Sequence, residues 1–136
     1  KRGRVVEARK VALLTAIGAG ILLSTALALG VKFVAALFLS TGTNGYRIAS
    51  AGMPLMASGF IFYIVNVTVI GYFQSVERIR PATIYSFARG LFFLVPSFLI
   101  MPHIAGTPGI WLALPVSEAL TFLLIFSSRL AGRIRG

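Results

Sequence analysis

The sequence predicts an all-α integral membrane protein with four transmembrane helices. Of its 136 residues, 57% are hydrophobic and 12% are charged, whereas about 25% of an average soluble domain is charged. So few charges cannot cover the surface of a globule this apolar. The apolar residues also form four runs, each close to or above the roughly 20 residues that a helix needs to cross a bilayer. The runs lie at about 11–40, 46–76, 82–101 and 110–128.

The first two runs are longer than a bilayer requires, so we expect tilt, bending or helical extensions beyond it. The first run is too long for the core of a signal peptide and lacks a convincing cleavage site. It ends at an uncharged turn, STGTNG (40–45). The second run contains Pro54, which leaves the carbonyl near Ser50 without its helical partner, and we expect a kink there.

The third run follows a charged connection, ERIRPA (77–82), in which Pro81 is well placed to open the helix. A second uncharged turn, PHIAGTPG (102–109), separates the third run from the fourth. Pro96 in the third run and Pro115 in the fourth remove backbone donors, so we expect a kink at each. No connection has the length or composition of a linker to a second domain.

The charge distribution predicts the orientation of the helices. The net charge is +10, but the basic residues lie between apolar runs and not on one face with aromatics, so nucleic acid is not an expected partner. If four helices alternate, the opposite side holds only Arg47 and His103. The positive-inside rule then places both ends in the cytoplasm, at the inner (plasma) membrane. The residues on the cytoplasmic side are Lys1, Arg2, Arg4, Arg9, Lys10, Arg78, Arg80, Arg89, Arg129, Arg133 and Arg135.

Apart from Arg47 at the edge of the second run, three charged residues lie inside the predicted spans. Lys32 either extends to the outer interface or pairs with an interior group such as Glu118. Arg89 either extends to the cytoplasmic headgroups or lines the mouth of a cavity. Glu118 is near the middle of its span, and its side chain is too short to reach an interface. A charge in the middle of a bilayer costs about 2.5–3.5 kcal/mol on insertion scales. We therefore expect Glu118 to be protonated or to face a polar interior.

The neighbours of Glu118 indicate which face of the helix is interior. Pro115, Ser117 and Thr121 lie on the same face as Glu118 at helical spacing. Pro115 also frees the carbonyl of Trp111. Inside a membrane, this carbonyl needs a hydrogen bond from a neighbouring group or from water. Two interpretations remain open for Glu118: a site of proton exchange, or a structural carboxyl group that ties helices together.

A matching polar stripe runs along the second span. It passes through Gly59, Tyr63, Asn66, Ile70 and Gln74 in steps of four, three, four and four residues. We predict that Tyr63, Asn66 and Gln74 line a pathway for substrate or ions, together with Arg89, Ser117, Glu118 and Thr121. The alternative is ordinary hydrogen bonding between helices.

Catalytic and metal-binding motifs are absent from the sequence. There is no cysteine, and the single histidine, His103, has no serine or cysteine nucleophile placed beside it. No glycine-rich phosphate loop with lysine, HExxH motif or carboxylate cluster is present. We therefore expect no enzymatic activity, no cofactor and no metal site.

The stretch YFQSVERIRP and its continuation to residue 124 resemble the end of a multidrug and toxic compound extrusion (MATE) transporter. Residues 73–76 match the Phe-Gln-Ala-Ile-Gly run of the family closely, with Glu77 in place of Gly. Arg89 and Gly90 resemble the start of helix eleven. GIWLALPVSE (109–118) resembles the start of helix twelve, and Glu118 stands where Asp is common. KRGRVVEARK (1–10) resembles the basic linker before helix nine.

The resemblance implies that residues 1–136 are helices nine to twelve, part of the second lobe of a twelve-helix, two-lobed antiporter. Such proteins expel small organic cations or amphipathic drugs in exchange for H⁺ or Na⁺. The chain begins without Met, and we expect the amino-terminal part of the same transporter as its partner. One branch of the family has a carboxylate on helix ten, but 63–66 contains no acid. The main coupling carboxylate is then expected in the first lobe.

Two alternatives share the predicted helix count or fold. A stand-alone four-helix transporter similar to the small multidrug resistance family would act as a dimer, but that family has its glutamate in the first helix, and this first run has none. A flippase for lipid-linked precursors would need a larger, more cationic cavity than Arg89 alone establishes.

Overall fold

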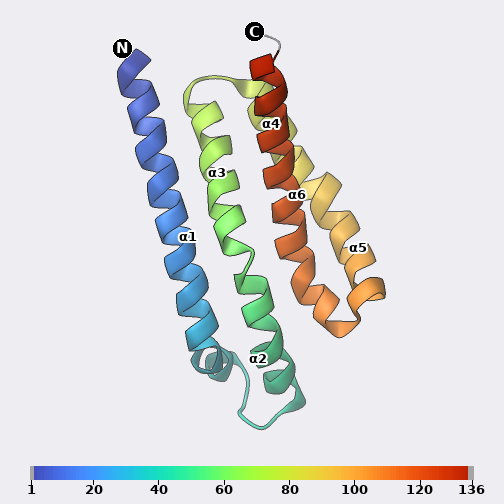
Figure 1. Cartoon of the computed structure of the whole chain (residues 1–136). Coiled ribbons are helices and arrows are strands. Elements are labelled where there is room, and N and C mark those ends of the chain that lie inside the picture. The colour runs from blue at the N-terminus through green and yellow to red at the C-terminus, as the bar shows by residue number, and fades with distance from the viewer. Residues whose placement is uncertain (1, 135–136) are drawn as a thin grey trace.

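The computed structural model of the chain describes residues 2–134, which form helices joined by short turns with no strand among them. The chain passes up and down an elongated bundle, with α1, the pair α2 and α3, the stretch from α4 to α5, and α6 running in alternate directions (Figure 1). The start of α1, the α3–α4 connection and the end of α6 lie at one end, which we call the basic end because Lys10, Arg78, Arg80 and Arg129 lie toward it. The elements are α1 (Arg2–Phe38), α2 (Asn44–Ala57), α3 (Phe60–Ser75), α4 (Ile79–Phe87), the π-helical segment η1 (Ala88–Phe93), α5 (Leu94–Ala105) and α6 (Thr107–Ile134).

Three helical stretches are long and apolar enough to cross a membrane: Val6–Phe38, Ile79–Ala105 and Thr107–Arg129. The pair α2 and α3 makes a fourth if the two count as one bent span. Large apolar side chains cover the outside of the bundle, and Leu29, for example, is 83% exposed. An outer surface of this kind suits lipid or further helices. The architecture is consistent with a multi-pass membrane protein.

The helices differ from the predicted runs mainly at their ends. The first begins at Arg2 and ends at Phe38, where the run predicted about 11–40. The third covers Ile79–Ala105 and not 82–101, and the fourth covers Thr107–Ile134 and not 110–128. Hydropathy marks only the part of a helix that lipid must cover, while Arg, Lys, Glu and Ala continue the helix beyond it.

The last predicted turn is shorter than expected. Residues 102–105 belong to α5, with Pro102 inside the helix, and the chain turns at Gly106. The Gly106 amide donates a hydrogen bond of 2.9 Å to the Pro102 carbonyl, which closes the end of α5.

The second predicted span, 46–76, is interrupted. Pro54 lies inside α2, and the break comes four residues later, at Ser58 and Gly59, where α2 and α3 are bent by 48°. A Cβ atom on Gly59 would lie 2.8 Å from the Cα of Pro115, so only glycine permits this approach to α6. The break exposes the Ala57 carbonyl, and Ser24 of α1 donates a hydrogen bond of 2.8 Å to it.

Of the other two expected kinks, the one at Pro96 differs from the structure, and the one at Pro115 stays a prediction. The irregular part of the third span is η1, which ends before Pro96, and Pro96 lies in the first turn of α5. A missing backbone donor is tolerated best in the first turn of a helix. Pro115 lies inside α6, which continues through it as a single helix. Because η1 is π-helical, the side chains of α5 that follow it are rotated by about 100° relative to an uninterrupted helix.

Glu77 closes α3 in a conformation that usually requires glycine. Its φ is +57°, the left-handed region. The Arg78 amide donates to the Phe73 carbonyl at 2.9 Å, and the Glu77 amide donates to the Gln74 carbonyl at 3.1 Å. This pair of hydrogen bonds is the Schellman motif. Glu77 therefore makes a turn for which Gly is the usual residue.

The interior of the bundle is apolar toward the basic end and polar halfway along. Val69, Ile70, Tyr85 and Ile125 form the apolar cluster. Farther from the basic end, the largest fully buried side chains are polar: Glu118, Asn66, Thr121 and Ser117. Because buried polar groups need partners, the contacts of these four residues define the candidate site.

Candidate functional site

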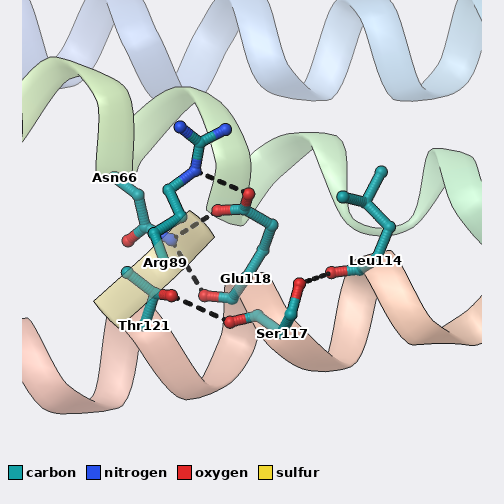
Figure 2. Close-up of polar contacts among 6 residues, drawn as sticks. All are labelled: Asn66, Arg89, Leu114, Ser117, Glu118 and Thr121. Atoms are coloured by element: carbon teal, nitrogen blue, oxygen red, sulfur yellow. Dashed lines mark hydrogen bonds and ion pairs between the residues drawn. The ribbon is translucent and has the colours of Figure 1, made fainter. Parts of the chain in front are cut away.

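Glu118 is the centre of the buried polar group, and two other segments supply its partners. The Glu118 side chain, on α6, is 2% exposed. Arg89 of η1 donates from Nε to Oε1 at 2.7 Å, and Asn66 of α3 donates from Nδ2 to Oε2 at 2.9 Å (Figure 2). Asn66 Nδ2 also donates to the Glu118 backbone carbonyl at 2.9 Å. Both carboxylate oxygens are therefore satisfied, and three segments are tied together.

Arg89 uses only part of its hydrogen-bonding capacity on Glu118. Its guanidinium carbon lies 4.5 Å from the centre of the Tyr63 ring, a cation–π contact. The two terminal amino groups point away from the carboxylate (Figure 2). Its side chain is 26% exposed. Arg89 is paired with Glu118 inside the bundle, which does not fit extension to the headgroups; that it lines the mouth of a cavity stays a prediction.

The Arg89–Glu118 ion pair follows from equal depth in two antiparallel helices. Arg89 lies ten residues after Ile79, and Glu118 lies eleven residues before Arg129, both counted from the basic end. At 1.5 Å per residue, each charge is roughly 15 Å from that end. The sequence analysis named both residues but not the pair, and this count was the signal that would have found it. Lys32 is exposed near the far end of α1, so it is not the partner of Glu118.

Ser117 and Thr121 are buried, as is Pro115, so the predicted face of α6 does point into the bundle. Their hydroxyls, however, bond to their own helix. Ser117 Oγ donates to the Leu114 carbonyl at 2.8 Å, and Thr121 Oγ1 donates to the Ser117 carbonyl at 2.9 Å (Figure 2). These hydroxyls are internally satisfied and let α6 pack closely, while Glu118 makes the contacts between helices.

The polar stripe of the second span is only partly brought together. Asn66 is fully buried against Glu118, and Tyr63 contacts Arg89. Gln74 is exposed, one residue before the end of α3, and does not reach the cluster. Helical spacing placed Gln74 on the same face as Asn66, but Gln74 lies about two turns farther along α3 and is exposed there.

The cluster is formally neutral, because one guanidinium faces one carboxylate. It offers no free carboxylate to a cation, and no group of three His, Cys, Asp or Glu side chains that could hold a metal occurs in the described part of the chain. One acceptor remains open: among residues 2–134, nothing donates to the buried Oδ1 of Asn66.

Fold and cluster together define a helical bundle with an internal ion pair and helices that are long and apolar enough to cross a membrane. Comparison with protein-family models, curated proteins and solved structures gives no match.

Proposed function

We propose that the chain is part of a MATE-type secondary active transporter that expels small organic cations or amphipathic drugs in exchange for H⁺ or Na⁺. The Arg89–Glu118 ion pair with Asn66 carries the proposal. Ionisable residues inside apolar helices are rare and mark transport pathways, proton relays or the interiors that support them.

The interrupted helix also favours a transporter. Many transporters build the region around their binding site from discontinuous helices. The ends of these helices leave backbone groups free to bind a substrate or ion or to form hydrogen bonds with neighbouring helices. Here the break between α2 and α3 lies against Pro115, three residues before Glu118. The sequence resemblance supports the same class, because residues 73–76 and 109–118 carry its motifs.

Within this proposal, Glu118 holds the lobe together and Arg89 neutralises it. A carboxylate already paired at 2.7 Å does not present a free charge to a coupling ion. The main coupling carboxylate then belongs to the amino-terminal part of the transporter. Both ends of the chain lie in the cytoplasm in this proposal, supported by their shared position at the basic end (Figure 1).

An efflux assay on the whole protein tests the proposal. Cells that express it are loaded with a fluorescent cationic dye, and export is followed before and after the H⁺ and Na⁺ gradients are dissipated. We expect gradient-dependent dye export and no movement of a lipid-linked precursor. Glu118→Gln should weaken export modestly, since an amide keeps an acceptor for Arg89, while the exposed control Glu7→Gln leaves it unchanged.

Dye export that continues unchanged after both the H⁺ and Na⁺ gradients are dissipated would contradict secondary transport. Movement of the lipid-linked precursor without dye export would favour the flippase alternative. Abolished export in Glu118→Gln, with the protein folded, would make Glu118 a coupling residue and not a structural one.

A further inference from the structure

The amide of Asn66 leaves one hydrogen-bond acceptor open at the centre of the bundle. Asn66 is 0% exposed, and its Nδ2 donates twice to Glu118. Its Oδ1 points to the other side, away from the carboxylate, and the described residues offer it no donor (Figure 2). A buried polar atom without a partner is unfavourable because it has lost its hydrogen bonds to water, so a donor from outside the chain is expected.

A cavity reaches Asn66 from the basic end. It has a volume of about 120 Å³, lies between α1, α3 and α6, and is lined by Asn66, Val69 and Arg129 among others. A second cavity of about 270 Å³ is lined by residues of the same three helices, including Thr68 and Ser75. Leu13, Val69 and Arg129 line both cavities, so the two adjoin. Because one water needs about 10–15 Å³ of such space, even the smaller cavity is large enough for several, and Asn66 and Arg129 are the polar residues in its lining.

Arg129 determines what can occupy this space. It lines both cavities, and its guanidinium carbon lies 5.5 Å from the centre of the Phe73 ring. A fixed positive charge disfavours metal ions and organic cations by Coulomb repulsion. It accepts water without penalty, and water also supplies the donor that Asn66 Oδ1 lacks.

We propose that the two cavities form a water-filled passage from the basic end of the bundle to the amide oxygen of Asn66. The water donates to Oδ1 and hydrates the cluster from one side only. The passage rests on the proposed transport function in one respect: it gives the cluster that the transporter uses a solvent connection separate from the path of its cationic substrates.

Cysteine accessibility tests the passage, because this chain contains no cysteine of its own. Val69, which lines both cavities and is 5% exposed, is changed to cysteine in the whole protein, with any cysteine elsewhere replaced by serine. The matched control is Val67→Cys, two residues away at nearly the same depth but 41% exposed on the outer surface. A small anionic methanethiosulfonate is added to oriented vesicles, because only a hydrated thiolate reacts.

We expect Val69→Cys to react at least tenfold faster than Val67→Cys, and only with reagent on the side of the basic end. An equal or slower rate, or reaction from the opposite side alone, overturns the passage. If Val69→Cys does not assemble, Thr68→Cys in the wider cavity takes its place. It must also react faster than Val67→Cys, and only with reagent on the side of the basic end. Dye export is measured in parallel: export without reaction refutes the passage alone, and reaction without export refutes the transporter proposal alone.

Discussion

Removing either partner of the Arg89–Glu118 pair should destabilise the protein, and by different amounts. Arg89→Met leaves a carboxylate that is only 2% exposed, so the change should cost about 3–5 kcal/mol in the free energy of unfolding. Glu118→Leu leaves a guanidinium that is 26% exposed and already lies on the Tyr63 ring. Its cost should be lower, about 1–3 kcal/mol, as for an unsatisfied but partly hydrated group.

The double variant Arg89→Met/Glu118→Leu removes both charges and should be close to the original protein, since apolar replacement of a buried pair is often neutral. If the double variant is neutral, the coupling free energy equals the two single costs together, about 4–8 kcal/mol. It is measured on the whole protein in mixed micelles, by titration with a denaturing detergent and circular dichroism. The outer-face change Leu29→Met, at a side chain 83% exposed, is the control.

Additive single effects, within about 0.5 kcal/mol, would refute the reasoning, because they would mean that the two charges do not depend on each other. A double variant that is less stable than either single variant would refute it as well. Equal costs for Arg89→Met and Glu118→Leu would show that the difference in exposure has no energetic consequence.

Two further predictions concern backbone geometry, each measured by the midpoint of thermal unfolding in detergent. Gly59→Ala should destabilise by about 1–3 kcal/mol, because its Cβ would lie 2.8 Å from the Pro115 Cα, whereas Gly71→Ala, with nothing within 4 Å of the added atom, should not; equal effects would contradict the contact. Glu77→Gly should stabilise by about 1 kcal/mol, because it relieves a left-handed φ of +57°. Glu77→Ala removes the same charge but keeps the left-handed backbone strain. If Glu77→Ala is also more stable than the original protein, the effect comes from the charge and not from the strain.

The apolar character of the helices and the inward face of α6 were predictable because both depend on residues close together in the chain. Pro115, Ser117, Glu118 and Thr121 lie within seven positions, and helical periodicity alone puts them on one face. All four are buried. Gln74 shows the limit of that reasoning, since periodicity assigns a face but does not show where a helix loses its neighbours.

The kinks were less predictable, because a proline shows where a backbone bond is missing and not where the helix yields. The bend of the second span lies at Gly59 and not at Pro54, and Gly59 packs directly against the backbone of Pro115 on α6. In the third span, the π-helical segment before Pro96 takes up the irregularity. Both outcomes depend on packing against another helix.

The sequence by itself determined that the chain is helical, that its helices are apolar enough for a membrane, and that Glu118 faces inward. Only the tertiary structure decided that the carboxylate is held by Arg89 and Asn66, which lie 29 and 52 positions away in the chain. It also decided that Asn66 lines a cavity and that its Oδ1 receives no hydrogen bond from the described residues. Periodicity describes neighbours within one helix, whereas these partners are set by how helices of equal depth pack side by side.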